Sequence, residues 1–388
     1  MRSSLPSFLA FGAYGLFWGT WGAALPALRD AAGLSDAELG VALLFVGLGG
    51  LPAMLFTGRT VDHFGARVTG VLLVALAVTG AVAAILGRDL VTLSLGMLLV
   101  GAASGAADVA QNALAGFAEQ RSGRRTITVA HAVFSSFVVI GSLGAGGLRS
   151  AGADAGGVFA VAGVLLAGGG LAVWLLGDRP VRGPGSSFPS GRVGRRWALP
   201  FVVVGLVGAL GFAVENAHQS WSAIFLADEL AAPPALAAVA PATFAVFAAL
   251  TRFAAGLLTR IPSAALLPGG AALAVLGTLI LSAAHTLPLA LAGLALAAVG
   301  TSVLYPTLLS RATRDVPADR RGRATAAVAT TSYLGFVAGP MFVGVLAAGL
   351  DLRGAMIGVA ALAVAFAVLA PLVTRRAPAA GRPVGAPV

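Results

Sequence analysis

The sequence contains no cysteine and no lysine, and it has few charged residues of any kind. Only 10% of its 388 residues are charged, whereas soluble domains carry about a quarter. Without cysteine there are no disulfides, thiol catalysis or cysteine-ligated metal sites. The net charge of +10 does not indicate nucleic-acid binding, because it is spread over a chain that is 58% hydrophobic. This composition excludes an ordinary soluble enzyme, a disordered protein and a nucleic-acid binder.

Hydrophobic segments long enough to cross a lipid bilayer make up most of the chain. A span needs about 20 mostly apolar residues to cross a hydrocarbon core about 30 Å thick. In lipid only helices and closed barrels satisfy their backbone hydrogen bonds, and these segments lack the alternation of barrel strands. We therefore predict an all-α integral membrane protein with twelve transmembrane helices, at residues 6–28, 36–57, 68–87, 90–116, 127–149, 155–177, 198–226, 236–259, 264–284, 287–312, 324–349 and 353–374.

The distribution of arginine predicts the orientation of these spans. With the N-terminus placed inside, the 25 arginines fall in or beside inner connections, except for Arg29, Arg88, Arg149 and Arg353. An excess of positive charge marks the cytoplasmic side of a membrane protein. We therefore expect a multi-pass protein of the plasma (cytoplasmic) membrane with both termini in the cytoplasm.

The longest polar stretch divides the chain into two halves. It follows the sixth predicted span and is rich in Gly, Pro, Ser and Arg, as flexible linkers are. Two halves of similar length suggest duplication with pseudo-twofold symmetry, and the Gly-rich run of span 5 is echoed by residues 335–340 in span 11. We predict a six-helix bundle over residues 1–177, a cytoplasmic linker over 178–197, a second bundle over 198–374 and a disordered cytoplasmic tail over 375–388.

A charged glycine motif lies between the second and third spans. It follows the pattern G-x-x-x-D-x-x-G-x-R, with Gly58, Asp62, Gly65 and Arg67 at its fixed positions. The glycines permit a tight turn, and Asp62 can pair with Arg67 or with the dipole of a helix N-terminus. Such an ion cluster can act as a conformational lock between two bundles, and an ordinary charged turn is the alternative.

With this motif in a 6+6 arrangement, the chain resembles the major facilitator superfamily over nearly its whole length. The resemblance implies two six-helix bundles that rock about a central cavity between inward-open and outward-open states. The related position between spans 8 and 9 keeps Arg252, Gly256 and Arg260 but has no Asp. A second lock there is therefore expected to be weak or absent.

Acidic residues inside spans 4 and 7 are the strongest functional candidates, because an ionisable group in a membrane is costly. In span 4, Gln111 and Asn112 follow Asp108 by three and four residues and therefore share its helix face. His131, early in span 5, is predicted to lie at a similar depth.

Span 7 carries a comparable cluster around Glu215, with Asn216, His218 and Gln219. Glu215, His218 and Gln219 share one face of the predicted helix. No arginine is expected to neutralise either acid, because Arg252 is placed near the cytoplasmic end of span 8.

Burial without a cationic partner raises the pKa of a carboxyl group, and such a group can bind a proton on one side of the membrane and release it on the other. We therefore predict proton coupling through Asp108, Glu215, His131 and His218. The alternative is that each carboxyl stays protonated and hydrogen-bonded between helices, and that both histidines are neutral and satisfied.

An aromatic stripe on span 1 suggests where a solute binds. Tyr14, Trp18 and Trp21 follow one another by four and three residues, and aromatic faces suit sugar rings or flat apolar ligands. The alternative is packing against lipid or an interfacial belt, for which Trp21 near the outer end is the strongest candidate. Because spans 1, 4, 7 and 10 line the cavity in the superfamily, the predicted cavity residues are Tyr14, Trp18, Gln111, Asn112, Asn216, Gln219, Trp221 and Tyr305.

The segments 108–112 and 215–222 also resemble the fucose-permease-like branch of the superfamily. That resemblance implies proton-linked symport of a small polar solute, with Asp108 or Glu215 carrying the proton. We therefore predict a secondary transporter rather than an enzyme. We expect it to move a small, sugar-like or other polar solute together with protons by alternating access, as a monomer in the lipid bilayer and without a cofactor.

A drug/proton antiporter of the same fold is the nearest alternative. Such exporters typically carry a proline in the glycine-rich motif of span 5 and an arginine in span 4. Here the glycine-rich run of span 5, from Gly141 to Gly147, has no proline, and span 4 has no arginine. A non-transporting receptor and a membrane-embedded enzyme are less favoured. The enzyme would need clustered catalytic groups, and the four histidines are dispersed.

Overall fold

The computed structural model describes residues 4–64, 67–123, 125–177, 195–257 and 263–375, and all regular secondary structure in these ranges is α-helical. The first half contains α1 (Leu5–Ala31), α2 (Asp36–Phe64), α3 (Arg67–Leu86), α4 (Leu90–Ser122), α5 (Thr126–Ser150) and α6 (Ala155–Leu176). The second half contains α7 (Arg195–Glu229), α8 (Pro234–Ala237), α9 (Val239–Leu257), α10 (Ser263–Ser282), α11 (Leu287–Thr301), α12 (Leu304–Thr313) and α13 (Ala318–Arg375).

Most predicted spans correspond to a single helix, and three regions depart from that pattern. Within the described ranges there are eleven helices long and apolar enough to cross a membrane. The predicted eighth span consists of the short α8 followed by α9, and the tenth consists of α11 followed by α12. The predicted eleventh and twelfth spans are both contained in α13, so twelve separate helices are not observed.

Asp351 interrupts α13 and separates the two segments predicted as spans. Its φ angle is 66°, in the left-handed region where a residue cannot continue a right-handed helix. Its Oδ1 accepts a hydrogen bond of 2.8 Å from the backbone N–H of Gly354, as a helix N-cap does. The chain therefore starts a new helical segment here.

Glycine allows the same close helix approach in both halves. A Cβ atom added to Gly141 of α5 would overlap the carbonyl oxygen of Leu16 in α1. Likewise, a Cβ atom added to Gly335 of α13 would overlap the carbonyl oxygen of Ala209 in α7. Small residues let membrane helices pack at short distance. The sequence echo between spans 5 and 11 therefore corresponds to one packing arrangement that occurs twice.

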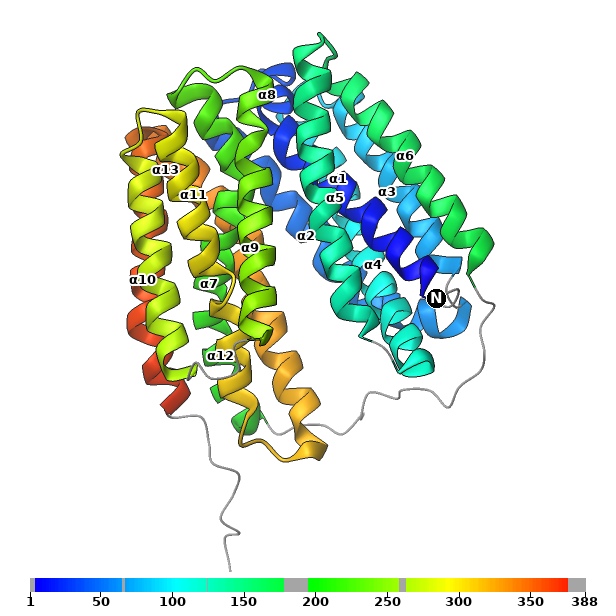
Figure 1. Ribbon diagram of the computed structural model, residues 1–388, viewed down its shortest axis with the longest axis vertical. Helices are drawn as coiled ribbons and strands as arrows, with labels where there is room; N and C mark the ends of the chain where they lie inside the picture. The colour runs from blue at the N-terminus through cyan, green and yellow to red at the C-terminus, as the bar shows by residue number, and fades with distance from the viewer. Residues whose placement is uncertain (1–3, 65–66, 124, 178–194, 258–262, 376–388) are drawn as a thin grey trace, which may run out of the picture.

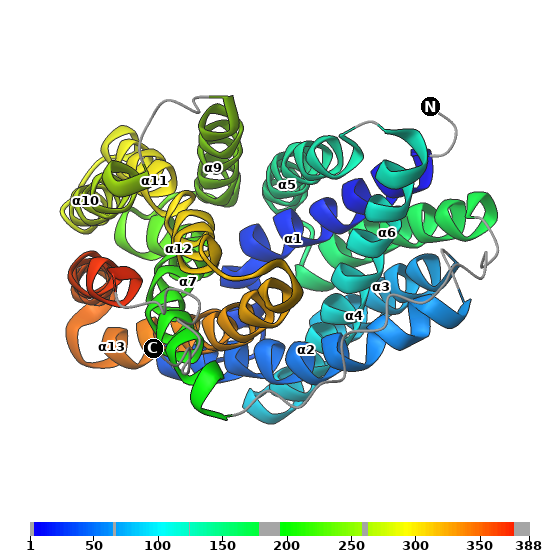
Figure 2. The ribbon, with the colours of Figure 1, turned by 90° about the horizontal axis from the view of Figure 1, so that it is seen from below.

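The helices form two bundles that meet at one end of the molecule. Figure 1 shows α1–α6 on one side and α7–α13 on the other, converging near α8 and diverging toward α12. Between the bundles, α1 packs on α7, α5 packs on α8 and α9, and α2 packs on α13. Viewed from the diverging end, α5 faces α9 across the boundary between the bundles (Figure 2).

The converging end is joined by an ion cluster that spans both bundles. Arg29, in the last turn of α1, donates hydrogen bonds to Asp36 of α2 at 2.8 Å and to Asp228 of α7 at 3.0 Å. The side chain of Arg29 is only 13% exposed. We call the end at which Arg29, Asp36 and Asp228 lie the closed end.

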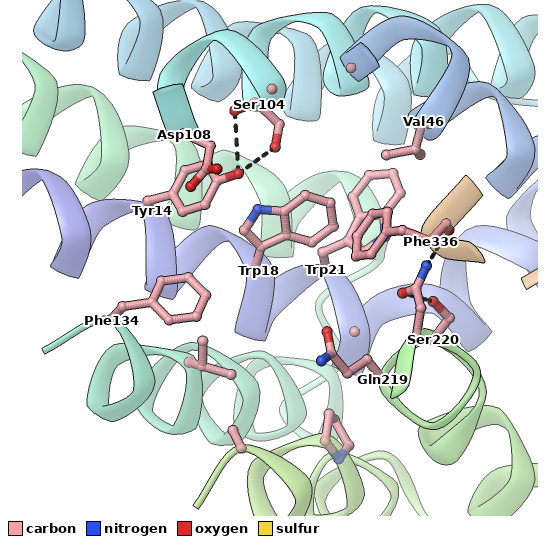
Figure 3. Close-up of a pocket in the computed structure, with 18 of the residues that line it drawn as sticks. Tyr14, Trp18, Trp21, Val46, Ser104, Asp108, Phe134, Gln219, Ser220 and Phe336 are labelled. Atoms are coloured by element: carbon pink, nitrogen blue, oxygen red, sulfur yellow. Dashed lines mark hydrogen bonds between the residues drawn. The ribbon is translucent and has the colours of Figure 1, made fainter. Parts of the chain in front are cut away.

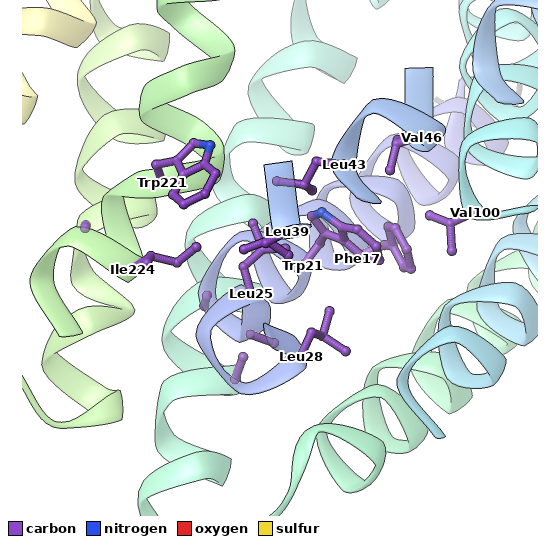
Figure 4. Packing of buried hydrophobic residues seen from close by; sticks show 14 of the residues in the cluster. Phe17, Trp21, Leu25, Leu28, Leu39, Leu43, Val46, Val100, Trp221 and Ile224 are labelled. Carbon is purple, nitrogen blue, oxygen red and sulfur yellow. The ribbon is translucent and has the colours of Figure 1, made fainter. Parts of the chain in front are cut away.

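An apolar cluster lies beside this ion cluster and crosses the same boundary. It joins Leu25 and Leu28 of α1 and Leu39 of α2 to Trp221 and Ile224 of α7, all fully or almost fully buried (Figure 4). Burial of apolar side chains is the main favourable term in association. The two bundles are therefore held together at the closed end by both apolar packing and ion pairs.

The outward surface of the molecule is apolar, as a bilayer requires. Large hydrophobic side chains stand exposed on most helices, for example Leu55, Val164 and Leu175, which are 72%, 72% and 61% exposed. Contiguous exposed apolar surface is unfavourable in water, whereas lipid is a good solvent for it. The surface therefore agrees with a multi-pass membrane protein.

Candidate functional site

A cavity of about 240 Å³ lies between the two bundles. Residues from α1, α2, α4 and α5 line it on one side, and residues from α7, α9 and α13 line it on the other. Figure 3 shows side chains from both bundles pointing into this space. Because each bundle contributes one wall, any rocking of the bundles changes the shape of the cavity.

The aromatic stripe of α1 forms part of the wall. Tyr14, Trp18 and Trp21 all line the cavity (Figure 3), with Trp18 edge-on to the other two at 6.3 and 6.1 Å between ring centroids. The alternative that Trp21 belongs to an interfacial belt does not fit its position. Trp21 is 3% exposed and stacks on Phe17 at 5.9 Å, because this face of α1 turns inward along its whole length.

Asp108 lines the first wall and is held by neutral partners. Gln111 Nε2 and Asn112 Nδ2 donate hydrogen bonds to its Oδ1 at 3.3 and 3.1 Å. Within the described ranges no arginine or histidine lies within ion-pair distance of this carboxyl. Gln111 and Asn112 were predicted to line the cavity, but they do not. Their amides donate to Asp108 instead.

Glu215 differs from Asp108 in having a cationic partner. The expectation that it lacks one is wrong. Arg252 of α9 donates from Nη2 to Glu215 Oε1 at 2.6 Å, and Gln219 Nε2 donates to the same oxygen at 3.1 Å. The Glu215 side chain is 12% exposed and that of Arg252 is 48% exposed. Arg252 and Gln219 line the cavity, whereas Glu215 does not.

Asn216 lines the cavity as predicted and also joins two helices of the second bundle. Its Nδ2 donates to the carbonyl oxygen of Phe336 in α13 at 2.6 Å. Ser220, one turn further along α7, donates to Asn216 Oδ1 at 3.3 Å. Since its amide is already engaged on both sides, Asn216 helps to fix the second wall.

The two histidines predicted for proton coupling lie outside the cavity wall. His218 is fully buried. Its Nδ1 donates to the carbonyl oxygen of Val214 at 2.7 Å, and its Nε2 lies 3.0 Å from Thr278 Oγ1. His131 packs edge-on against Phe11, with ring centroids 4.9 Å apart. For His218, the contacts fit the alternative of a neutral, satisfied side chain.

Two aromatic residues predicted for the cavity are packed elsewhere. Trp221 is fully buried in the apolar cluster of the closed end, and its Nε1 donates to the carbonyl oxygen of Pro340 at 3.1 Å. Tyr305 packs against Phe212, with 4.4 Å between ring centroids. Neither of them lines the cavity. Knowing which span a residue lies in did not predict the direction of its side chain.

Only part of the glycine motif between α2 and α3 lies within the described residues. Gly65 lies outside the described residues, and so do the side-chain surroundings of Gly58 and Asp62. Arg67, the last residue of the motif, begins α3 and its guanidinium lies 5.0 Å from the ring centroid of Trp174 in α6. The predicted linker residues 178–194 and tail residues 376–388 also lie outside the described ranges, while residues 195–197 of the predicted linker begin α7 and Arg375 ends α13.

Several cavity residues escaped the sequence analysis. On the first wall they include Ser104, which hydrogen-bonds Tyr14 Oη at 2.8 Å, and Phe134. On the second they include Arg252 and Phe336. A serine or phenylalanine in a hydrophobic span carries no distinct signal. Arg252 did carry a signal, because a charged residue within a predicted span is rare and costly.

Together the fold and the cavity define a helical membrane protein whose central site is shared by two bundles. The second half of the chain, residues 204–387, matches the model of the Major Facilitator Superfamily. The chain is 32% identical to the uncharacterised transporter y4wD of Sinorhizobium fredii, with 92% of this chain and 94% of that protein covered. It is 30% identical to an uncharacterised MFS-type transporter of Yersinia pestis, with 95% and 94% covered.

The fold is also similar to a crystal structure of a bacterial homologue of the human lysosomal transporter Spinster. The TM-score is 0.77 at 18% sequence identity, with 96% of each chain covered. The protein belongs to the major facilitator superfamily and is a secondary transporter rather than an enzyme.

Proposed function

We propose that the protein is a proton-coupled symporter of the plasma membrane for a small polar solute with a ring. The observation that carries the proposal is Asp108, a carboxyl group in the cavity wall whose hydrogen-bond donors are both neutral amides. Amide donors hold a carboxylate without cancelling its charge. The group therefore remains free to bind and release a proton, which a permanent ion pair would oppose.

Alternating access is the second part of the proposal. In this proposal the closed end faces the outside and both termini face the cytoplasm, as the arginine distribution favours. The segments of α13 on either side of Asp351 are then two separate spans, for a total of twelve. In this orientation the ion pair between Arg29 and Asp228 closes the outer side. The bacterial Spinster homologue with a similar fold is in an inward-facing conformation, which supports the same reading.

The size of the cavity favours a small solute over a drug. Its volume of about 240 Å³ lies below the range of about 300–1,000 Å³ typical of drug-sized ligands. Tyr14, Trp18 and Trp21 offer ring faces, and Gln219 is an exposed amide on the opposite wall. A sugar-like ring with polar substituents therefore fits better than the large apolar cations of multidrug antiporters.

Proteoliposome transport tests the proposal directly. With an inward-directed proton gradient and a panel of labelled monosaccharides and sugar acids, wild-type protein should concentrate a solute. Asp108→Asn should abolish accumulation while solute exchange across the membrane survives. Asp154→Asn, which alters an acid that caps α6 away from the cavity, is the matched control and should behave as wild type. Accumulation that persists in Asp108→Asn, or efflux of a dye in exchange for protons, would contradict the proposal.

A further inference from the structure

Arg252 presents unused hydrogen-bond donors to the cavity. A guanidinium carries five N–H donors, and the described contacts of Arg252 use one of them, on Nη2. Its side chain is 48% exposed and lines the cavity. Arg252 therefore has donors available on a surface that a solute can reach.

The carboxylate that pairs with Arg252 does not itself line the cavity. Glu215 does not line the cavity and is 12% exposed, and both of its described donors, Arg252 and Gln219, meet the same oxygen, Oε1. The pair thus turns its positive end toward the solute. One N–H taken by Glu215 leaves the guanidinium able to bind a second carboxylate through two parallel N–H groups, the arrangement that arginine favours.

Among the described residues, the opposite wall has no basic side chain and offers ring surfaces. Trp18 and Trp21 lie edge to face with each other, and Phe134 of α5 adds a third ring nearby. In the described part of the cavity wall, Arg252 is the only basic residue and Asp108 the only acidic one. When Asp108 carries its proton, as the proposed function requires, Arg252 is the remaining charge that faces the solute.

From this arrangement we infer that the solute is a small ring compound with a carboxylate, whose anionic group binds Arg252 in competition with Glu215. The inference rests on the proposed function for the state of Asp108, and it names the solute class that the function leaves open. The ring lies against the aromatic wall of α1, and the carboxylate reaches the guanidinium on α9. Glu215 then acts as an internal counter-ion that holds Arg252 in place when the cavity is empty.

Binding to detergent-purified protein tests the inference with matched pairs of probes. Glucuronate is compared with glucuronamide, and cyclohexanecarboxylate with cyclohexanecarboxamide, by thermal shift and by isothermal titration. The acid of at least one pair should bind and its amide should bind at least tenfold more weakly. Arg252→Gln should weaken binding of that acid roughly 10- to 100-fold, the range of charge-assisted hydrogen bonds, and leave the amide within about twofold.

Glu215→Gln should act in the opposite direction, because it removes the competitor and keeps the hydrogen-bonding shape. Binding of the acid should tighten by roughly 3- to 10-fold, a shift within the range of one hydrogen bond. A structural role for the pair predicts instead that both substitutions weaken binding. Arg252→Lys keeps the charge and serves as the folding control at this position, and Arg88→Gln, in the connection before α4, is the control for loss of an arginine elsewhere.

The inference is overturned if acids and amides bind equally, if none of the acids binds wild-type protein, or if Glu215→Gln weakens binding as much as Arg252→Gln does. These outcomes are separable from failure of the proposed function, since binding needs no proton gradient. Acids that bind through Arg252 in a protein that shows no proton-driven accumulation would leave the inference standing and contradict the symport mechanism.

Discussion

Each bundle has one acidic residue in or beside the cavity wall, Asp108 in the first and Glu215 in the second, and the two acids differ in their partners. Asp108 on the first wall is held by the amides of Gln111 and Asn112. Glu215, which does not itself line the cavity, is paired with Arg252. Asp108 therefore has no fixed counter-charge among its described hydrogen-bond partners, whereas Glu215 has one in Arg252. Under the proposed function and the further inference, proton exchange belongs to the first bundle and charge-based solute recognition to the second.

The largest expected effect comes from neutralising each of the two acids in turn. In substrate-driven proton uptake by proteoliposomes, Asp108→Asn should reduce proton movement to background. Glu215→Gln should retain most of it, because the solute site survives and Asp108 is intact. Proton uptake that depends on Glu215 and survives Asp108→Asn would reverse the assignment.

The ion pair of the closed end provides the next largest effect. Asp228→Asn removes the negative charge and one of the two oxygens that accept from Arg29 across the bundles, at a cost to the closed state of about 1–2 kcal/mol, or roughly a 5- to 30-fold change in equilibrium. The chain has no cysteine, so a single Cys in place of Ser220 in the cavity wall reports its accessibility cleanly.

Labelling of that cysteine by an impermeant maleimide added from outside should accelerate when Asp228→Asn is present. Asp30→Asn is the matched control, because Asp30 contacts Arg29 from the same helix and does not join the bundles. An unchanged labelling rate in Asp228→Asn would show that the apolar cluster alone keeps this end closed.

Removal of the guanidinium should also affect stability. Arg252→Gln leaves Glu215, which is 12% exposed, without its ion pair, and we expect a loss of about 1 kcal/mol, because the half-exposed arginine is screened. The double variant Arg252→Gln with Glu215→Gln should recover part of this loss. Thermal unfolding in detergent gives the order of the three variants, and a double variant that is less stable than either single one would contradict a direct pairing.

The smallest expected effect is the contrast between substitutions of Trp221 and Trp18. Trp221→Phe loses the hydrogen bond to Pro340 and a closed-end contact, so it should lower stability by about 1 kcal/mol with solute affinity retained. Trp18→Ala removes a ring from the cavity wall and should lower solute affinity with little effect on unfolding. Titration and unfolding of both variants measure the contrast, and equal effects on affinity would place Trp221 in the solute site after all.

The sequence was informative about contacts within one helix. Hydrophobic run length predicted the spans, and residues three and four apart predicted the contacts of Asp108 with Gln111 and Asn112 and of Glu215 with Gln219. Both follow from the fixed geometry of an α-helix. The same geometry placed Tyr14 and Trp18 on one face.

Contacts between helices could not be obtained in this way. Arg252 lies 37 residues from Glu215, and the pairing depends on how α9 packs on α7, which no local spacing encodes. Trp221 and Tyr305 were misassigned for related reasons. Trp221 lies on α7, which lines the cavity, but its side chain is buried in packing. Tyr305 lies on α12, which contributes no residue to the described cavity wall. For Trp21 the error was one of depth, because span length does not show how far the cavity extends toward the closed end.

The central claim is that Asp108 binds and releases a proton in the cavity, and infrared difference spectroscopy tests it most directly. Titration of the purified protein with acid should produce a carboxyl band that is lost in Asp108→Asn and retained in Glu215→Gln. Solute addition should shift that band. A band that is unchanged in Asp108→Asn and absent in Glu215→Gln would contradict the account.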